Sequence, residues 1–266
     1  MTNENKEKQF SRRDFLKNSG MVAGGIAGGT LFGGLISGSL LKNDSKYPKD
    51  DKSNSTSDNS QNTKDELEFL KARMFFDRIE DYKTLEAACE LIYPEDDNGP
   101  GAIQLGAPLF IDKQLAMIWG INGNEYRDGP FEVPVVHSGL DKVIHNRNTR
   151  QSIFLDGLRT MNKKSHDDYN KPYYELDEKQ QAEIMDQFVE GSIEMKTVES
   201  DGFFALLKQS VLEGVYSDPL YGGNKSMEGW KMRDFPGAQM SYANYIDSEE
   251  FVQDQLEPVS LRDYQH

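Results

Sequence analysis

The first 63 residues have a composition that excludes them from a packed domain, and this constrains the fold more than any other feature. From Asn18 to Leu41 no residue is charged and eight are glycine, each of which costs a helix about 1 kcal/mol relative to alanine. Residues 42–63 are nearly all Lys, Asp, Asn, Ser, Thr and Gln, so they cannot bury enough apolar area to offset chain entropy. We expect a disordered polar linker over 42–63 and one folded domain over 64–266.

Residues 11–17 read S-R-R-D-F-L-K. Paired arginines followed by Phe-Leu and a lysine are the pattern of a twin-arginine export signal. The residues that carry it are Ser11, Arg12, Arg13, Phe15, Leu16 and Lys17. We expect the twin-arginine translocase to recognise residues 1–41 and to export the chain.

The uncharged stretch over 18–41 can also be interpreted as a membrane anchor. As a helix it would be roughly 35 Å long, at about 1.5 Å per residue, which is enough to cross a bilayer. No A-x-A cleavage site is present, and Ser37-Gly38-Ser39 is a poor substitute. The two interpretations are compatible. Because the basic flank stays in the cytoplasm, both place the domain at the extracytoplasmic face of the cytoplasmic membrane.

Composition excludes several classes of protein. The net charge of −15 argues against nucleic-acid binding, which needs a basic face. The single cysteine, Cys89, excludes a disulfide framework and a cluster or zinc site built from several cysteines. A mean hydropathy of −0.71 excludes a polytopic membrane protein.

From Lys64 onward, apolar residues recur at helical spacing, and no alternating run is long enough to predict a strand. The fold class that follows is mostly α: a single irregular helical domain with long loops. The pattern begins with Leu67, Phe69, Leu70, Met74 and Phe75, and loops are expected over 95–101 and 120–134. Helices are expected over 84–92, ended by Pro94; over 107–118, entered through Pro108; over 149–161; from a capping box of Asp177 and Gln180; and from a cap at Asp201 to about residue 215.

Signatures of catalysis or cofactor binding are missing. Gly99 and Gly101 begin a G-x-G, but Gln104 replaces the third glycine and no strand precedes it. The histidines at 137, 145, 166 and 266 form no H-E-x-x-H, and Glu95-Asp96-Asp97 lacks the ligand spacing of an EF-hand. Cys89 lies on an apolar helical face, so we expect a small core residue there. We predict no catalytic, cofactor-binding or metal-binding residue in this chain.

Residues 219–240 read P-L-Y-G-G-N-K-S-M-E-G-W-K-M-R-D-F-P-G-A-Q-M, hereafter the glycine-rich block. The segment contains too much glycine for us to expect a helix, and it is too irregular for a hairpin. Its aromatic residues either pack on the domain as an Ω-loop or bind a partner, since Trp and Tyr dominate interface hot spots. Composition leaves both open. The predicted docking residues are Tyr221, Gly222, Gly223, Asn224, Trp230, Phe235, Pro236 and Gly237.

Four segments resemble the gluconate 2-dehydrogenase subunit 3 family: L-E-A-A-C-E-L-I-Y-P-E-D-D-N-G-P-G-A at 85–102, F-I-D-K-Q-L-A at 110–116, E-G-V-Y-S-D-P-L-Y-G-G-N at 213–224 and G-W-K-M-R-D-F-P-G-A-Q at 229–239. With G-P-F at 129–131, the resemblance covers about residues 75–242. It implies a small, non-catalytic subunit of a membrane-associated dehydrogenase for a sugar or sugar acid. The implied partner is a large flavoprotein of the glucose–methanol–choline type that holds FAD, in many systems together with a cytochrome c subunit.

The signal and the resemblance together suggest that this chain escorts and stabilises the folded flavoprotein during export. Two other classes stay open. An autonomous exported enzyme would need a concave site with a carboxylate of perturbed pKa. A surface-tethered binding module would need only the signal and the linker.

Overall fold

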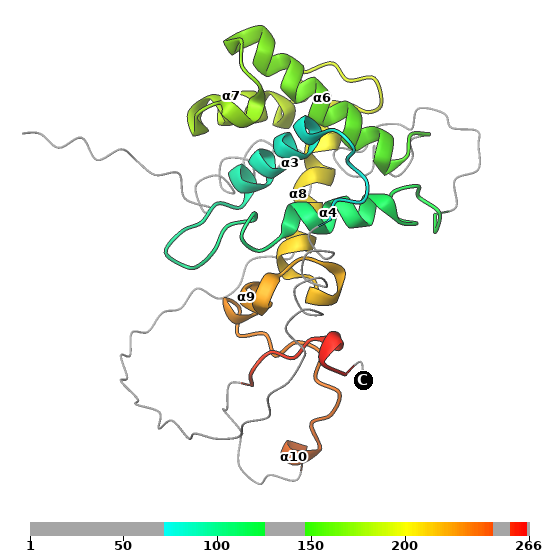
Figure 1. Ribbon diagram of the computed structural model, residues 1–266, viewed down its shortest axis with the longest axis vertical. Helices are drawn as coiled ribbons and strands as arrows, with labels where there is room; N and C mark the ends of the chain where they lie inside the picture. Colours follow the sequence, from blue (N-terminus) through cyan, green and yellow to red (C-terminus); the bar gives the residue numbers. More distant parts are fainter. Residues whose placement is uncertain (1–71, 126–146, 247–255, 265–266) are drawn as a thin grey trace, which may run out of the picture. The chain divides into compact units, whose positions relative to one another are not determined.

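The structure is a computed structural model that describes residues 72–125, 147–246 and 256–264 (Figure 1). The predicted export signal and the predicted linker lie outside these ranges. All the described elements belong to one compact unit, which includes every described residue from Arg73 onward.

The described elements are almost entirely helical. In chain order they are α3 (Ile79–Ile92), α4 (Ala107–Ala116), α6 (Arg150–Tyr169), the 3-10 helix η1 (Tyr173–Glu175), α7 (Glu178–Val189), α8 (Ser200–Tyr216), η2 (Pro219–Tyr221), η3 (Lys225–Met227), α9 (Glu228–Lys231), α10 (Ala243–Ile246) and η4 (Leu261–Tyr264). Extended pairing in the described ranges is limited to two isolated bridges, Asp96–Gly99 and Gly237–Val259. The prediction of a mostly α fold is confirmed. No helix within the described ranges has both the length and the apolar character needed to cross a membrane.

Local signals explain where several helices begin and end. The predicted capping box at the start of α7 is present, with the Asp177 side chain accepting from the backbone N–H of Gln180. The Thr149 hydroxyl accepts from Ser152 N and caps α6. That helix continues to Tyr169, beyond the predicted end at residue 161, and stops at Asn170 in the left-handed conformation.

Two predicted helix starts are also wrong, and α4 ends at Ala116 rather than at residue 118. The residue at the N-cap of α8 is Glu199, and Asp201 lies in the first turn, where a negative charge suits the helix dipole. α3 begins at Ile79 rather than Thr84, because its first turn buries no apolar side chain and Ile79 is exposed.

The predicted helical pattern also fails at Met74 and Phe75, which lie in a non-helical segment before α3. The fully buried Asp112 of α4 accepts backbone N–H groups from Met74, Phe75 and Phe76, with N···O distances of 2.5, 3.1 and 2.9 Å. These three donors satisfy a carboxylate that would otherwise be costly to bury. Asp112 therefore fixes the non-helical segment that leads into α3.

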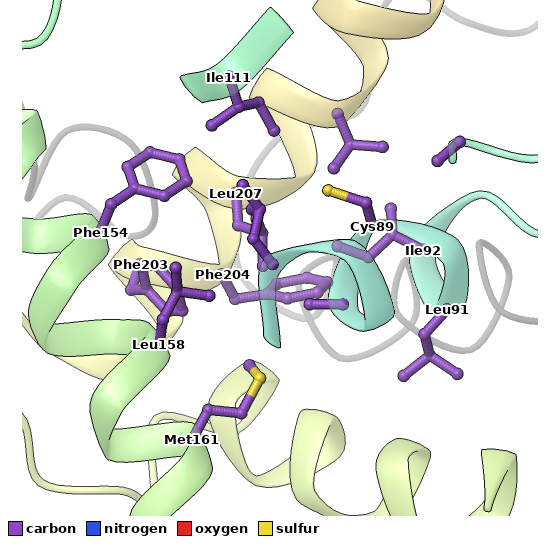
Figure 2. Close-up of a cluster of buried hydrophobic side chains, with 14 of the residues drawn as sticks. Cys89, Leu91, Ile92, Ile111, Phe154, Leu158, Met161, Phe203, Phe204 and Leu207 are labelled. Carbon is purple, nitrogen blue, oxygen red and sulfur yellow. The ribbon is translucent and has the colours of Figure 1, made fainter. Parts of the chain in front are cut away.

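The core forms around α8, which packs against α3, α4, α6 and α7 (Figure 1). Figure 2 shows Phe154 and Leu158 of α6 and Phe203 and Leu207 of α8 meeting side chains of α3 and α4. Phe203 contacts two other rings edge-on, with centroid distances of 5.9 Å to Phe154 and 5.7 Å to Phe188. Cys89 is fully buried in this core, as predicted.

Candidate functional site

The glycine-rich block folds into short helical turns directly after α8. These turns are η2, η3 and α9, so the expectation that so much glycine prevents any helix is wrong in detail. Four residues within or between these turns have positive φ: Gly222 at 96°, Asn224 at 45°, Ser226 at 57° and Met227 at 59°. Three of these are not glycine and cost backbone energy, so surrounding contacts must hold them in place.

Asn224 supplies the main contacts. It is fully buried, its amide donates to Ser217 O at 2.9 Å, and its side-chain oxygen accepts from Gly229 N at 2.7 Å. Its backbone N–H also donates to Gly214 O. One side chain therefore joins the end of α8 to the start of α9.

The glycines of the block lie against this chain's own backbone. A Cβ at Gly223 would overlap Gly214 O, one at Gly229 would overlap Val215 O, and one at Gly237 would overlap Val259 O. Gly222 lies against the Lys113 side chain. Close packing of the block on this chain therefore requires glycine at these positions, without any contact to a partner.

Trp230 lies inside the block with 6% of its surface exposed. Its indole N–H donates to Tyr216 O at 2.8 Å, and its ring contacts Phe235 edge-on with a centroid distance of 5.3 Å. The structure thus gives Trp230 a packing role within this chain. Whether it also contacts a partner stays a prediction.

A C-terminal segment, residues 256–264, packs on the same block. Val259 N donates to Pro236 O, and Ala238 N donates to Val259 O at 2.7 Å. Asp218, whose Oδ1 accepts from Leu220 N at the start of η2, also accepts from Ser260 Oγ at 2.6 Å and from Leu261 N at 2.8 Å. These bonds make the block and the C-terminal segment one structural unit.

Tyr93, Tyr216 and Arg233 come from three of the four segments that carry the family resemblance, and the fold brings them together. The two tyrosine hydroxyls lie 3.0 Å apart, and the rings meet edge-on with a centroid distance of 6.2 Å. Arg233 places its Cζ 5.1 Å from the Tyr216 ring centroid, and its Nε donates to the Tyr216 hydroxyl at 3.3 Å. We call these three residues the Tyr–Tyr–Arg cluster.

Exposed apolar side chains surround the block. Tyr221 is 48% exposed and Phe235 is 47% exposed, while Pro236 is half-buried. A groove of about 460 Å³ lies beside Tyr221, lined by Phe110, Gln114, Glu213, Tyr216, Ser217, Asp218 and Tyr221. Of the eight predicted docking residues, Tyr221 and Phe235 thus present the most side-chain surface, whereas Gly223, Asn224 and Trp230 are buried.

The other features that the sequence drew attention to offer little chemistry. Glu95, Asp96 and Asp97 line an open groove of about 500 Å³ with Glu228 and Lys225. Within the described ranges, no group of three or more His, Cys, Asp or Glu side chains is arranged to hold a metal ion. His166 is exposed on α6, and the other three histidines lie outside the described residues.

Sequence reasoning missed Tyr93, Tyr216, Asp218 and Arg233 as parts of the site. All four stood inside the quoted segments, but nothing in the spacing indicated that Tyr93 and Tyr216, 123 residues apart, share a hydrogen bond. The aromatic and glycine content drew attention to the block alone.

In a comparison with known protein families, residues 79–237 match the model described as gluconate 2-dehydrogenase subunit 3. No curated protein and no solved structure gives a match. The matched range covers more than half of the chain and spans both the helical core and most of the glycine-rich block. The chain belongs to the gluconate 2-dehydrogenase subunit 3 family.

Proposed function

We propose that this chain is the small, non-catalytic subunit of a membrane-associated, FAD-dependent dehydrogenase for a sugar or sugar acid. It binds a large flavoprotein subunit of the glucose–methanol–choline type, stabilises it, and escorts it through twin-arginine export. The complex works at the extracytoplasmic face of the cytoplasmic membrane, anchored there by residues 18–41 if the signal is retained. A cytochrome c subunit is a further candidate partner.

One observation carries the proposal: the chain that belongs to this family also contains S-R-R-D-F-L-K at 11–17. A flavoprotein folds around FAD in the cytoplasm, where the cofactor is made, and then needs an export route that accepts folded cargo. A bound subunit with a twin-arginine signal supplies that route. Binding only the folded flavoprotein also stabilises it by mass action.

The proposed docking surface is the exposed side of the glycine-rich block. Tyr221 and Phe235 supply aromatic side chains to the partner, and Pro236 lies next to Phe235. The other predicted docking residues support this surface indirectly, because their internal contacts fix the backbone that carries the exposed rings. They are Gly222, Gly223, Asn224, Trp230 and Gly237. Rings held in one position lose little entropy on binding, which favours affinity.

We place FAD in the partner subunit. The groove at residues 95–105 is a poor fit for FAD, because Glu95, Asp96, Asp97 and Glu228 line it and would repel the pyrophosphate. The role that we assign to this chain is binding and delivery.

The test is Arg12→Lys with Arg13→Lys in the full chain, which keeps the charge but removes both guanidinium groups. We expect this chain and its flavoprotein to remain in the cytoplasm, measured by fractionation and by FAD-dependent dehydrogenase activity outside the cytoplasm. Lys6→Arg with Lys8→Arg is the matched control and should leave export unchanged. If the flavoprotein is exported normally in the double arginine variant, the escort role is wrong.

A further inference from the structure

We propose that Arg233 is a pre-oriented receptor for a carboxylate, and that it binds an acidic side chain of the flavoprotein subunit. The inference rests on the proposed function, and it adds one charged contact to a surface that is otherwise aromatic.

Contacts with Tyr216 fix the orientation of the Arg233 side chain. Its guanidinium stacks on Tyr216 and donates Nε–H to the Tyr216 hydroxyl, which is hydrogen-bonded to Tyr93. Tyr93 is 5% exposed and belongs to the core. The backbone N–H of Arg233 also donates to Trp230 O at 2.9 Å. A side chain that is normally flexible is thus held before any partner arrives, so less entropy is lost on binding.

The terminal nitrogens of Arg233 have no acceptor within the described ranges, although the chain carries 45 acidic residues. Three other arginines do pair with carboxylates: Arg78 with Glu80, Arg150 with Glu125, and Arg159 with Asp81. The hydrogen bond that Arg233 donates to the Tyr216 hydroxyl raises the pKa of Arg233, and a guanidinium is charged at every relevant pH in any case. An exposed guanidinium with an open fork is suited to a bidentate carboxylate contact.

Arg233 is also joined to the exposed aromatic surface. Arg233 stacks on Tyr216, and the backbone carbonyl of Tyr216 accepts a hydrogen bond from the Trp230 indole. The Trp230 ring in turn contacts the half-exposed Phe235. Arginine and aromatic side chains together are the composition of interface hot spots. A carboxylate on the partner would meet the guanidinium against the Tyr216 ring, which covers one face of the guanidinium, and burial of this contact under the partner would reduce its screening.

An anionic lipid headgroup offers similar chemistry, but the surroundings favour a protein. Membrane attraction needs a cluster of four or more basic residues. The glycine-rich block has Lys225, Lys231 and Arg233, offset by Glu228 and Asp234, and Lys231 is paired with Glu228 at 2.9 Å. One oriented guanidinium suits one partner carboxylate better than a charged lipid surface.

The test measures binding of the full chain to the FAD-containing flavoprotein that co-purifies with it, after the two are separated and recombined. We expect Arg233→Gln to weaken binding about 10-fold or more. Arg233→Lys should give a smaller loss, because lysine keeps the positive charge but lacks the paired N–H donors of a guanidinium. Lys225→Gln removes an exposed cation from the same block and should bind as the wild type does. Raising the salt concentration should weaken the wild type more than Arg233→Gln.

Each outcome decides a different point. If Arg233→Gln binds the flavoprotein as tightly as the wild type, the receptor role is wrong while the subunit role stands. If the wild type binds no flavoprotein, the proposed function itself fails. If Arg233 is needed only for binding vesicles of anionic phospholipid, the proposed occupant is wrong. Equal melting temperatures for Arg233→Gln and Lys225→Gln would show that lost binding does not come from unfolding.

Discussion

The helical core (the described part of residues 76–216) and the C-terminal region (the described part of residues 217–264) are held together by different means. The core cluster contains 29 buried apolar residues, the last of which is Val215. After that point Trp230 is the sole large apolar side chain in the described residues that is buried. In the C-terminal region, two other kinds of contact take the place of apolar packing. The backbone comes into close contact at the glycines, and the side chains of Asp218 and Asn224 form hydrogen bonds. A region stabilised in this way can keep its aromatic side chains at the surface, where a partner can use them.

The largest expected effect comes from the core. Phe203→Ala removes a fully buried ring that contacts Phe154 and Phe188 and should lower the free energy of unfolding by about 3–5 kcal/mol. Because α8 packs against α3, α4, α6 and α7, the loss should reduce hydrogen-exchange protection in all of these helices.

Phe235→Ala is the matched control in the other region. Its ring is 47% exposed and contacts mainly Trp230, so the cost should be about 1 kcal/mol or less. Urea unfolding of both variants measures the difference. Equal losses would mean that the two regions do not differ in how they are stabilised.

The next effect tests the C-terminal region alone. Asn224→Ala leaves Gly229 N and Ser217 O without their partners, which costs about 1–3 kcal/mol for each buried group. We expect the loss to be local: exchange protection should fall over residues 217–239, while α3 and α6 keep theirs. Asn224→Asp keeps the acceptor for Gly229 N and should retain part of the protection. Global loss in Asn224→Ala would show that the core depends on the block.

The same comparison explains what the sequence could predict. The core helices follow from local signals: Pro108 in the first turn of α4, the capping box of Asp177 and Gln180, and the apolar spacing of Ile153, Phe154 and Leu158. Each acts within one or two turns of its own helix. Such signals are visible in a single sequence.

The site could be predicted only in part, because its geometry depends on distant pairs. The glycines and aromatic residues marked the block, but their close contacts are with α8 and Val259. The hydroxyl of Tyr93 contacts that of Tyr216, and the Asp112 carboxylate accepts hydrogen bonds from the backbone of residues 74–76. Nothing in the spacing or residue type of these side chains singles them out in the sequence. No periodicity encodes such contacts, so the Tyr–Tyr–Arg cluster emerged only from the structure.

The smallest expected effect depends on pH. Burial raises the pKa of Glu86 on α3, although Lys83 and Arg73 act to lower it. A carboxyl group with a folded pKa above its unfolded pKa contributes stability that is present below the unfolded pKa and lost as pH rises through the folded pKa.

Glutamine cannot ionise, so the Glu86→Gln protein should be more stable than the wild type at a pH above both pKa values of Glu86. The difference should be about 0.5 kcal/mol, because the site is only partly buried. The two proteins should converge as the pH falls below both pKa values. Urea unfolding of both proteins over a series of pH values measures the difference, and a Glu86→Gln profile parallel to that of the wild type would show that burial does not disfavour the ionised form of Glu86.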